Sequence, residues 1–225
     1  MTKKILASEL SPFGARLRIA SALKGLNVVF EPPPGGTGST EMKKLNPWGR
    51  IPALITNKGT VLVESLALLE YLEDTHPGAR SLRPHDAAKL AQARMIALLF
   101  DHNVLKALQP VYAQLQAAKP DVSVVAKAFD DVTAELEKLV TFFDDAGPGA
   151  AGELSIADCA MAPFAFLIGA MAHGFGVPSP TQRVPTFAAW WARFGQIPEV
   201  KQVTDAQQKA LMAYAAAKKA QAGGA

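Results

Sequence analysis

The sequence predicts an α+β protein in two parts: a small mixed domain over residues 1–79 and an all-helical bundle over residues 87–225, joined by a linker at residues 80–86. Three observations predict this fold class. Residues 4–31 have the pattern strand, helix, strand, and residues 51–75 continue with two strands and a helix. Beyond the linker, apolar residues recur at helical spacing only. A chain of 225 residues is long enough for two such domains.

The first part begins with a βαβ pattern. Residues 4–7 are short and apolar and predict a buried strand. Residues 15–24 place apolar side chains on one helix face, and Gly25 predicts the end of that helix, because glycine tolerates the left-handed conformation after the last turn. Residues 27–31 are rich in β-formers. A helix this short between two strands indicates parallel strands with a right-handed crossover.

A surface loop and a short helix come next. Residues 32–40 are rich in proline and glycine, which predicts a loop. This loop lacks the Gly-Lys-Ser/Thr ending of a phosphate-binding loop and the glycine spacing of a dinucleotide fingerprint. Residues 41–45 predict a short helix before a turn at residues 46–49.

A hairpin and a helix complete the first part. Residues 51–55 and 61–63 predict two strands joined by a glycine turn, and Ser65 is expected to cap a helix that runs to about residue 75. A βαβ unit followed by a hairpin and a helix is the thioredoxin-like arrangement. Where thioredoxins carry Cys-x-x-Cys, this chain has residues 11–14, Ser-Pro-Phe-Gly, so dithiol chemistry is excluded.

The second part is predicted to be helical throughout. Helices are expected over residues 87 to about 106, 122–144 and 155–172. Pro110 is expected to kink or divide the first of these. Two further helices are expected at the aromatic stripe Phe187, Trp190, Trp191 and Phe194 and in the alanine-rich tail beyond residue 205. Ser155 and Asp158 form a variant capping box, and the apolar helix that they open is expected at the centre of this domain. The aromatic stripe is interpreted as core, and the tail as a helix that frays.

Composition excludes several classes of function. The 23 basic and 20 acidic residues give a net charge of +3, too small and dispersed for a nucleic-acid surface. The longest apolar run, residues 159–172, is too short to span a bilayer, and no signal-like segment is recognised. The single cysteine, Cys159, allows no intrachain disulfide, and the four histidines show no metal-ligand spacing. We therefore expect a cytoplasmic protein without a metal.

Ser11 is the candidate functional residue. Pro12 suits a first helical position, which makes Ser11 the expected N-cap. The hydroxyl oxygen of a capping serine accepts a backbone N–H bond, while its proton stays free to donate. A donor at the positive end of a helix suits a thiolate or another anion. The alternatives are that Ser11 only caps the helix, or that the neighbouring Ser8 supplies the hydroxyl.

The ordered motifs resemble the glutathione transferase superfamily over nearly the whole chain. The residues that carry the resemblance are Ser11-Pro12-Phe13, Arg16-x-Arg18-Ile19-Ala20, Leu23-Lys24-Gly25-Leu26, Asn46-Pro47-x-x-x-Ile51-Pro52-x-Leu54, Glu64-Ser65-x-x-x-x-Glu70-Tyr71-Leu72 and Ser155-Ile156-Ala157-Asp158. Ser-Pro-Phe is similar to the tau class, whereas Arg-x-Arg-Ile-Ala, residues 70–73 and residues 157–159 are also similar to the zeta class. The chain lacks the Ser-Ser-Cys-Ser run of the zeta class, which argues against maleylacetoacetate isomerisation.

The resemblance implies a glutathione site in the first domain. Ser11 would donate its hydroxyl to the glutathione thiolate. The other implied glutathione-binding residues are Phe13, Arg50 (with Lys43 or Lys44), Ile51 ahead of a cis Pro52, Glu64 and Ser65. Arg50 would pair with the glycyl carboxylate, Ile51 with the cysteinyl backbone, Ser65 with the γ-glutamyl carboxylate, and Glu64 would lie near the ammonium group.

The implied activity is conjugation of the glutathione thiolate to a hydrophobic electrophile, in a homodimer. The electrophile site is expected between the two domains, and its candidate residues are Phe13, His102, Leu105, Tyr112 and Phe166. Two alternatives stay open. One is a glutathione-dependent isomerase or lyase that uses the same thiolate. The other is a non-catalytic binding or regulatory protein with the same fold.

Overall fold

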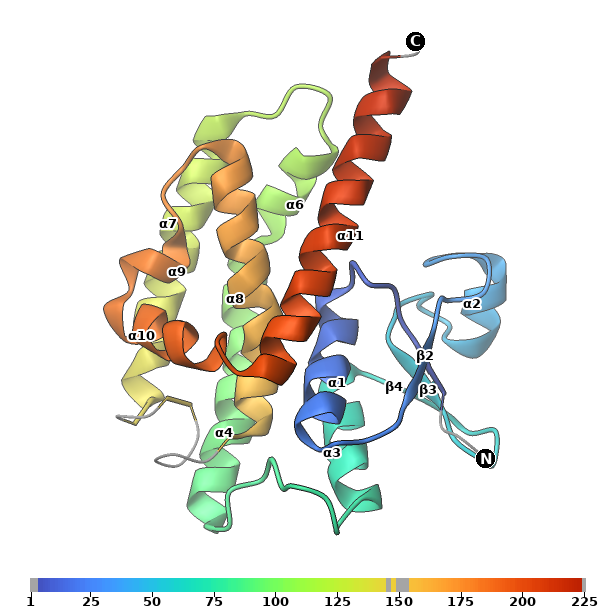
Figure 1. Ribbon diagram of the computed structural model, residues 1–225. Helices are drawn as coiled ribbons and strands as arrows, with labels where there is room; N and C mark the ends of the chain where they lie inside the picture. The colour runs from blue at the N-terminus through green and yellow to red at the C-terminus, as the bar shows by residue number, and fades with distance from the viewer. Residues whose placement is uncertain (1–3, 145–146, 149–153, 224–225) are drawn as a thin grey trace. The chain divides into compact units, whose positions relative to one another are not determined.

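The computed structural model describes residues 4–144, 147–148 and 154–223, and these form two compact units. One unit contains residues 1–80 and 197–225, and the other contains residues 81–196. Figure 1 traces the chain through both. The sequence pattern assigns residues 197–225 to the helical domain, whereas in the structure this segment belongs to the first unit.

A four-stranded mixed sheet forms the centre of the first unit. Its strands are β1 (Lys4–Leu6), β2 (Val29–Glu31), β3 (Ala53–Ile55) and β4 (Val61–Val63), in the spatial order β2-β1-β3-β4. β1 pairs in parallel with β2, while β1 with β3 and β3 with β4 pair antiparallel. Ile5 lies opposite both Phe30 and Leu54 and is completely buried. The structure thereby confirms the predicted βαβ unit and hairpin.

Four helices accompany this sheet. They are α1 (Pro12–Leu23), α2 (Thr40–Leu45), α3 (Ser65–Thr75) and α11 (Pro198–Gly223). α1 begins at Pro12, as the predicted cap at Ser11 requires and three residues before the apolar stretch 15–24, and Gly25 follows it with a φ of 64°, as predicted. α1 is buried nearly all round because it packs against both α3 and α11 (Figure 1). The tail helix is thus anchored at its start, where Val200 and Val203 are buried.

The second unit is helical among its described residues. Its elements are α4 (Ala87–Leu99), a π-helical segment η1 (Phe100–Val104), α5 (Leu105–Ala107), α6 (Gln109–Gln116), α7 (Val122–Leu139), a 3-10 segment η2 (Val140–Phe142), α8 (Ile156–Phe175), α9 (Pro180–Arg183) and α10 (Pro185–Phe194). The predicted helix over residues 87 to about 106 is confirmed, since α4, η1 and α5 follow one another without a break, but its last part contains the π-helical segment, which the sequence pattern does not predict. Pro110 occupies the first turn of α6, as expected of a proline that divides a helix.

α8 forms the core of this unit, as predicted. Its N-cap is Ser155, and the capping box with Asp158 is present in both directions. The helix spans 20 residues and, by length and composition alone, is apolar enough to cross a membrane. The apolar sequence run of residues 159–172 is shorter than this helix and does not indicate that. Most of it is buried against neighbouring helices, and an apolar core helix passes the same test. In the aromatic stripe, Phe187, Trp190 and Phe194 are buried and Trp191 is half-buried.

Candidate functional site

Ser11 is the N-cap of α1, as predicted. Its Oγ accepts a hydrogen bond from the backbone N–H of Gly14 at 3.1 Å, and Pro12 follows in the first turn. The Ser11 side chain is half-buried. Because this bond uses a lone pair of Oγ, the hydroxyl proton stays available to an anion at the N-terminus of the helix. The local geometry therefore suits both interpretations of Ser11, the cap and the anion donor.

Gly14 allows α1 to begin this close to the sheet. A Cβ atom at residue 14 would lie 2.7 Å from the Cβ of Ala7, a separation that side chains do not tolerate. Ala7 directly follows β1, and the Ser11 amide donates to the Ser8 carbonyl at 3.2 Å. Because Gly14 has no side chain, α1 can begin close to β1, and the Ser11 hydroxyl therefore lies near the end of that strand. Ser8 is also half-buried and stays the alternative hydroxyl.

Asn46 organises the loop that leads to Pro52. Its side chain is buried and its Nδ2 donates to the Arg50 carbonyl at 2.8 Å. Its Oδ1 accepts from the Trp48 amide at 3.2 Å. The Ile51–Pro52 peptide bond that follows is cis, as the resemblance implied. Ile51 is half-buried, and only Pro52 separates it from β3. Asn46 therefore shapes the backbone that the resemblance assigns to glutathione.

Three basic side chains in this region are exposed. Lys43 and Lys44 occupy the last turn of α2, and Arg50 lies in the loop that Asn46 holds. Exposed cations suit a carboxylate at the surface, such as the glycyl end of a peptide. Which of the three contacts such a ligand stays a prediction.

The N-terminus of α3 differs from the predicted cap. Glu64, and not Ser65, is the N-cap, and it makes no side-chain capping hydrogen bond. Ser65 is instead the first helical residue and is buried, with 6% of its surface exposed. Glu64 is exposed and has a φ of 69°, a left-handed conformation that costs a non-glycine residue about 1–3 kcal/mol. Such strain is concentrated at functional sites, and here it sets the direction in which the chain enters α3.

Arg16, in the second turn of α1, contacts the N-terminus of α3. Its side chain is fully buried, and its Nη1 donates to the Ser65 Oγ at 3.0 Å. The Arg16 Cζ also lies 4.9 Å from the centre of the Phe13 ring, within cation–π range. Sequence reasoning does not assign Arg16 to the site. A signal in the sequence could have found Arg16. Its spacing places a cation on the same helix face as the buried Ala20 and Leu23, where a charged side chain needs a polar partner.

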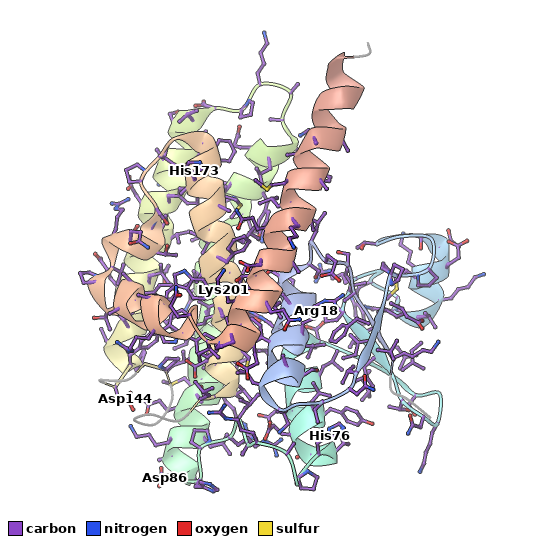
Figure 2. The ribbon with its side chains drawn as sticks, in the orientation of Figure 1. Arg18, His76, Asp86, Asp144, His173 and Lys201 are labelled. Atoms are coloured by element: carbon purple, nitrogen blue, oxygen red, sulfur yellow. The ribbon has the colours of Figure 1, made fainter. Side chains whose placement is uncertain are left out.

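Arg18 lies two residues further along α1 in a different environment. Its Nη2 pairs with the Glu9 carboxylate at 2.8 Å, and its Cζ lies 4.2 Å from the Phe30 ring centre. Partial burial lowers the pKa of Arg18, while the charge of Glu9 acts in the opposite direction. Figure 2 labels Arg18 on α1. Arg16 and Arg18 therefore differ in contacts although they share a helix.

The candidate electrophile residues lie on several elements. Phe13 is on α1 and 37% exposed. His102 lies in the π-helical segment and is exposed, whereas Leu105 is buried in α5. Tyr112 on α6 and Phe166 on α8 are half-buried. The electrophile contact of each stays a prediction, and burial already gives Leu105 a packing role.

The second unit also contains a cavity of about 420 Å³. It is lined by Val140, Phe143, Asp144, Gly147, Thr186, Ala189 and Arg193, and therefore by none of the predicted site residues.

Known proteins that are similar to this chain indicate its family. Residues 6–80 match the family model described as the glutathione S-transferase N-terminal domain. The chain is also similar to a protein of rice, Oryza sativa subsp. japonica, named probable glutathione S-transferase GSTU1. The two are 31% identical over 197 residues, which cover 85% of this chain and 84% of the rice protein. This chain belongs to the glutathione S-transferase superfamily.

Two further matches describe its place in the superfamily. The crystal structure of rice GST1 (OsGSTU1) in complex with glutathione superposes with a TM-score of 0.76 at 28% identity, covering 97% of this chain and 99% of that one. Maleylacetoacetate isomerase of Rattus norvegicus is 37% identical over 155 residues, covering 66% of this chain and 69% of the rat protein. The superfamily likeness and the thioredoxin-like plus helical fold are confirmed, with both tau-like and zeta-like features.

Proposed function

We propose that this protein is a glutathione transferase that conjugates the glutathione thiolate to a hydrophobic electrophile. The observation that carries the proposal is Ser11, a half-buried hydroxyl at the N-terminus of α1 whose oxygen already caps the helix. Its proton is free to donate to a sulfur anion. The rice relative bound to glutathione supports this substrate.

The groups at this site can supply the free energy that is needed to ionise the glutathione thiol. A thiol with a pKa near 8.5 is about 3% ionised at pH 7, and lowering its pKa by two units requires about 2.7 kcal/mol. A hydrogen bond to a charged group contributes about 1.5–3 kcal/mol, and a helix N-terminus adds about 0.3–1 kcal/mol. Because a more acidic thiolate is a weaker nucleophile, the net gain near neutral pH is about threefold. Most of the acceleration must come from holding the electrophile beside the sulfur.

The tripeptide would lie along the loop, the start of β3 and the N-terminus of α3. The backbone of Ile51 would pair with the cysteinyl residue in the manner of an added strand. Ser65 would hold the γ-glutamyl carboxylate, with the exposed Glu64 near the ammonium group. Arg50, with Lys43 or Lys44, would pair with the glycyl carboxylate. These residue types match the two carboxylates, one ammonium and one thiol of glutathione.

The assembly and location are part of the same proposal. We propose a homodimer in the cytoplasm that acts in detoxification, as is usual for this superfamily. Met95 and Leu98 support a partner surface, because they are three residues apart on α4 and are 36% and 48% exposed. Sedimentation of the purified protein tests the dimer.

Replacing Ser11 with alanine tests the catalytic role. We expect the pKa of the bound thiol, followed by ultraviolet thiolate absorbance, to rise by about one to two units, because a charge-assisted hydrogen bond is lost. Turnover of a chloronitrobenzene at pH 6 should fall about 4- to 15-fold and recover at high pH. At pH 6, glutathione affinity should change less than about twofold, because most of the bound thiol is still protonated there and the lost hydrogen bond acts on the thiolate only.

Ser8→Ala is the matched control, because Ser8 is equally half-buried but does not cap the helix. If Ser8→Ala raises the thiol pKa and Ser11→Ala does not, the catalytic role belongs to Ser8.

A glutathione-dependent isomerase is the second candidate. The likeness to rat maleylacetoacetate isomerase favours it, although that match covers a smaller share of this chain than the rice match does. Capture on immobilised glutathione, followed by conjugation and isomerisation assays, separates the candidates. Binding with isomerisation but no conjugation identifies the isomerase, whereas binding with neither activity identifies a regulatory protein.

A further inference from the structure

We infer that the cavity in the helical unit is a binding site for a zwitterionic ligand with an apolar body, in the class of the aromatic and aliphatic amino acids. The inference goes beyond the proposed function, because none of the predicted glutathione or electrophile residues lines this cavity. It begins from an acid and a base, Asp144 and Arg193, that line one cavity of about 420 Å³. Ligand sites in proteins usually measure about 300–1,000 Å³, so this volume suits a small metabolite.

One wall of the cavity is a face of α10. Thr186, Ala189 and Arg193 line the cavity and are spaced at i, i+3 and i+7, which places them on the same face of the helix. Each directly precedes a buried aromatic residue of the stripe, so α10 presents its rings to the core and this second face to the cavity. The face is about 10 Å long, because a helix rises about 1.5 Å per residue. The small side chain of Ala189 leaves room between the two polar ones.

A second wall is held in place by hydrogen bonds and packing. Asp144, labelled in Figure 2, lies just beyond η2. The Gly147 amide donates to both Oδ1 and the backbone carbonyl of Asp144, each at 3.1 Å. Gly147 in turn lies against the buried Trp190, whose Cδ1 would be 2.8 Å from an added Cβ. The Asp144 carboxylate is therefore positioned before a ligand binds, which lowers the entropic cost of binding.

The polar groups of the cavity suit both charges of a zwitterion. Lys89 lies 3.8 Å from Asp144 Oδ2, a long ion pair, and a carboxylate has about four acceptor positions, so Asp144 can also accept from a ligand ammonium group. The neighbouring Phe143 lines the same cavity, and the face of an aromatic ring attracts a cation. Arg193 has a planar guanidinium, which binds a carboxylate through two hydrogen bonds.

The rest of the lining suits an apolar body. Val140 and Ala189 line the cavity beside the half-buried Phe143. The Phe143 ring is held by Phe187 and Trp190, with its centre 6.4 Å from each of their ring centres. An aliphatic or aromatic ligand side chain would remove apolar surface from water here. A ligand with both charges and an apolar body therefore matches the lining better than an anion or a cation alone.

The test uses L-phenylalanine and two analogues that each lack one charge. Phenylpropionate lacks the ammonium group, and phenylethylamine lacks the carboxylate. Two-dimensional NMR of the isotope-labelled full-length protein measures each Kd. We expect a Kd below about 1 mM for L-phenylalanine and at least about threefold weaker binding of each analogue, because each loses one charge pair near the surface. A higher Kd for L-phenylalanine, or equal binding of all three compounds, overturns the inference.

Two variants assign the charges to residues. Arg193→Gln should weaken L-phenylalanine binding at least about threefold and change phenylethylamine binding less than about 1.5-fold, because that analogue has no carboxylate. Asp144→Asn keeps an oxygen that accepts from Gly147, and it should weaken L-phenylalanine and phenylethylamine but not phenylpropionate. Arg183→Gln is the matched control, because Arg183 pairs with Asp130 at 2.6 Å and does not line the cavity. Losses that do not depend on the ligand's charges, or a similar loss in the control, overturn the inference.

Ala189→Leu tests the location without changing a charge. Ala189 is exposed on α10 and leucine is a good helix former, so we expect the variant to fold, which thermal unfolding checks. The larger side chain fills the cavity and should weaken L-phenylalanine binding at least about tenfold. Ala192→Leu is the control, because Ala192 is exposed on the same helix outside the lining, and it should leave the affinity unchanged. Retained affinity in Ala189→Leu places the ligand elsewhere, the proposed glutathione site included, and overturns the inference.

Discussion

The indole Nε1 of Trp190 donates a hydrogen bond to Oδ1 of Asp158 at 2.7 Å, and both side chains are buried. The other carboxylate oxygen, Oδ2, accepts from the amide and the hydroxyl of Ser155, each at 2.8 Å. The capping box that begins α8 is therefore bonded directly to α10. Sequence spacing predicted the box, whereas the contact with Trp190 lies 32 positions away.

Trp190→Phe should destabilise the protein. The phenylalanine leaves the buried Asp158 Oδ1 without its donor, which costs about 1–3 kcal/mol, and the smaller ring adds a cavity. Urea unfolding followed by circular dichroism measures the loss. Trp191→Phe is the control on the same helix, because Trp191 is half-buried. Equal effects of the two substitutions would show that ring volume, and not the hydrogen bond, is responsible.

The stability of the wild type relative to Asp158→Asn should depend on pH. Burial raises the pKa of Asp158 above its ordinary value of 3.8, although hydrogen bonds from Trp190 and Ser155 act in the opposite direction. The folded state therefore binds this proton more tightly than the unfolded state does. The contribution is fully present below pH 3.8 and is lost as the pH rises through the folded-state pKa.

Urea unfolding of both proteins between about pH 4 and pH 8 measures this dependence, because the asparagine side chain of the variant does not titrate. The free-energy difference, wild type minus variant, should decrease as the pH rises. A difference that increases with pH would show that the hydrogen bonds outweigh burial at Asp158.

Lys24 and Glu73 form a buried ion pair that is expected to respond differently to single and double substitution. Their 2.6 Å contact joins the C-cap residue of α1 to α3, with side chains 1% and 5% exposed. Lys24 Nζ also donates to the Arg80 carbonyl at 2.7 Å. Each single substitution removes the ion-pair partner of a buried charge, so Lys24→Met or Glu73→Leu should each cost about 3–5 kcal/mol.

The double variant Lys24→Met with Glu73→Leu should recover much of that loss, because it removes both buried charges together. Denaturant midpoints of the three variants give the comparison. A double variant as unstable as the sum of the single ones would show that the pair is not coupled.

Gly14→Ala tests the close approach of α1 to β1. The new Cβ would lie 2.7 Å from that of Ala7, so the helix must move, and overpacking of this kind costs about 1–3 kcal/mol. The shift should also displace Ser11 and lower turnover. Gly169→Ala is the control: Gly169 lies within α8 with nothing within 4 Å of the added Cβ, so it should gain about 0.5–1 kcal/mol. Thermal unfolding and a conjugation assay measure both effects.

Local signals were enough for much of the fold and for part of the site. Ser11 followed by Pro12 defines an N-cap through atoms within one helical turn, and the structure has it there. Ser155 and Asp158 define a capping box in the same way. Such features depend on neighbouring residues in sequence, so no knowledge of the packing is needed to predict them.

The errors occurred where packing overrides a local preference. Ser65 is a good capping residue by type, yet the chain enters α3 at Glu64 in a left-handed conformation. Residues 87–106 are helical, as their spacing predicts, but that spacing does not indicate the π-helical segment that begins at Phe100, whose ring packs edge-on against Phe164. The alanine-rich tail has no motif, and only its packing on α1 assigns it to the first unit.

The sequence by itself determined the order of strands and helices, the cap at Ser11 and the superfamily, because each depends on residue type at short spacing. Only the tertiary structure decided the partners of its buried polar side chains. Arg16 reaches Ser65 across 49 positions, and Lys24 reaches Glu73 across the same separation. The physical reason is that a buried charge needs a partner, but which residue provides it depends on how the helices pack.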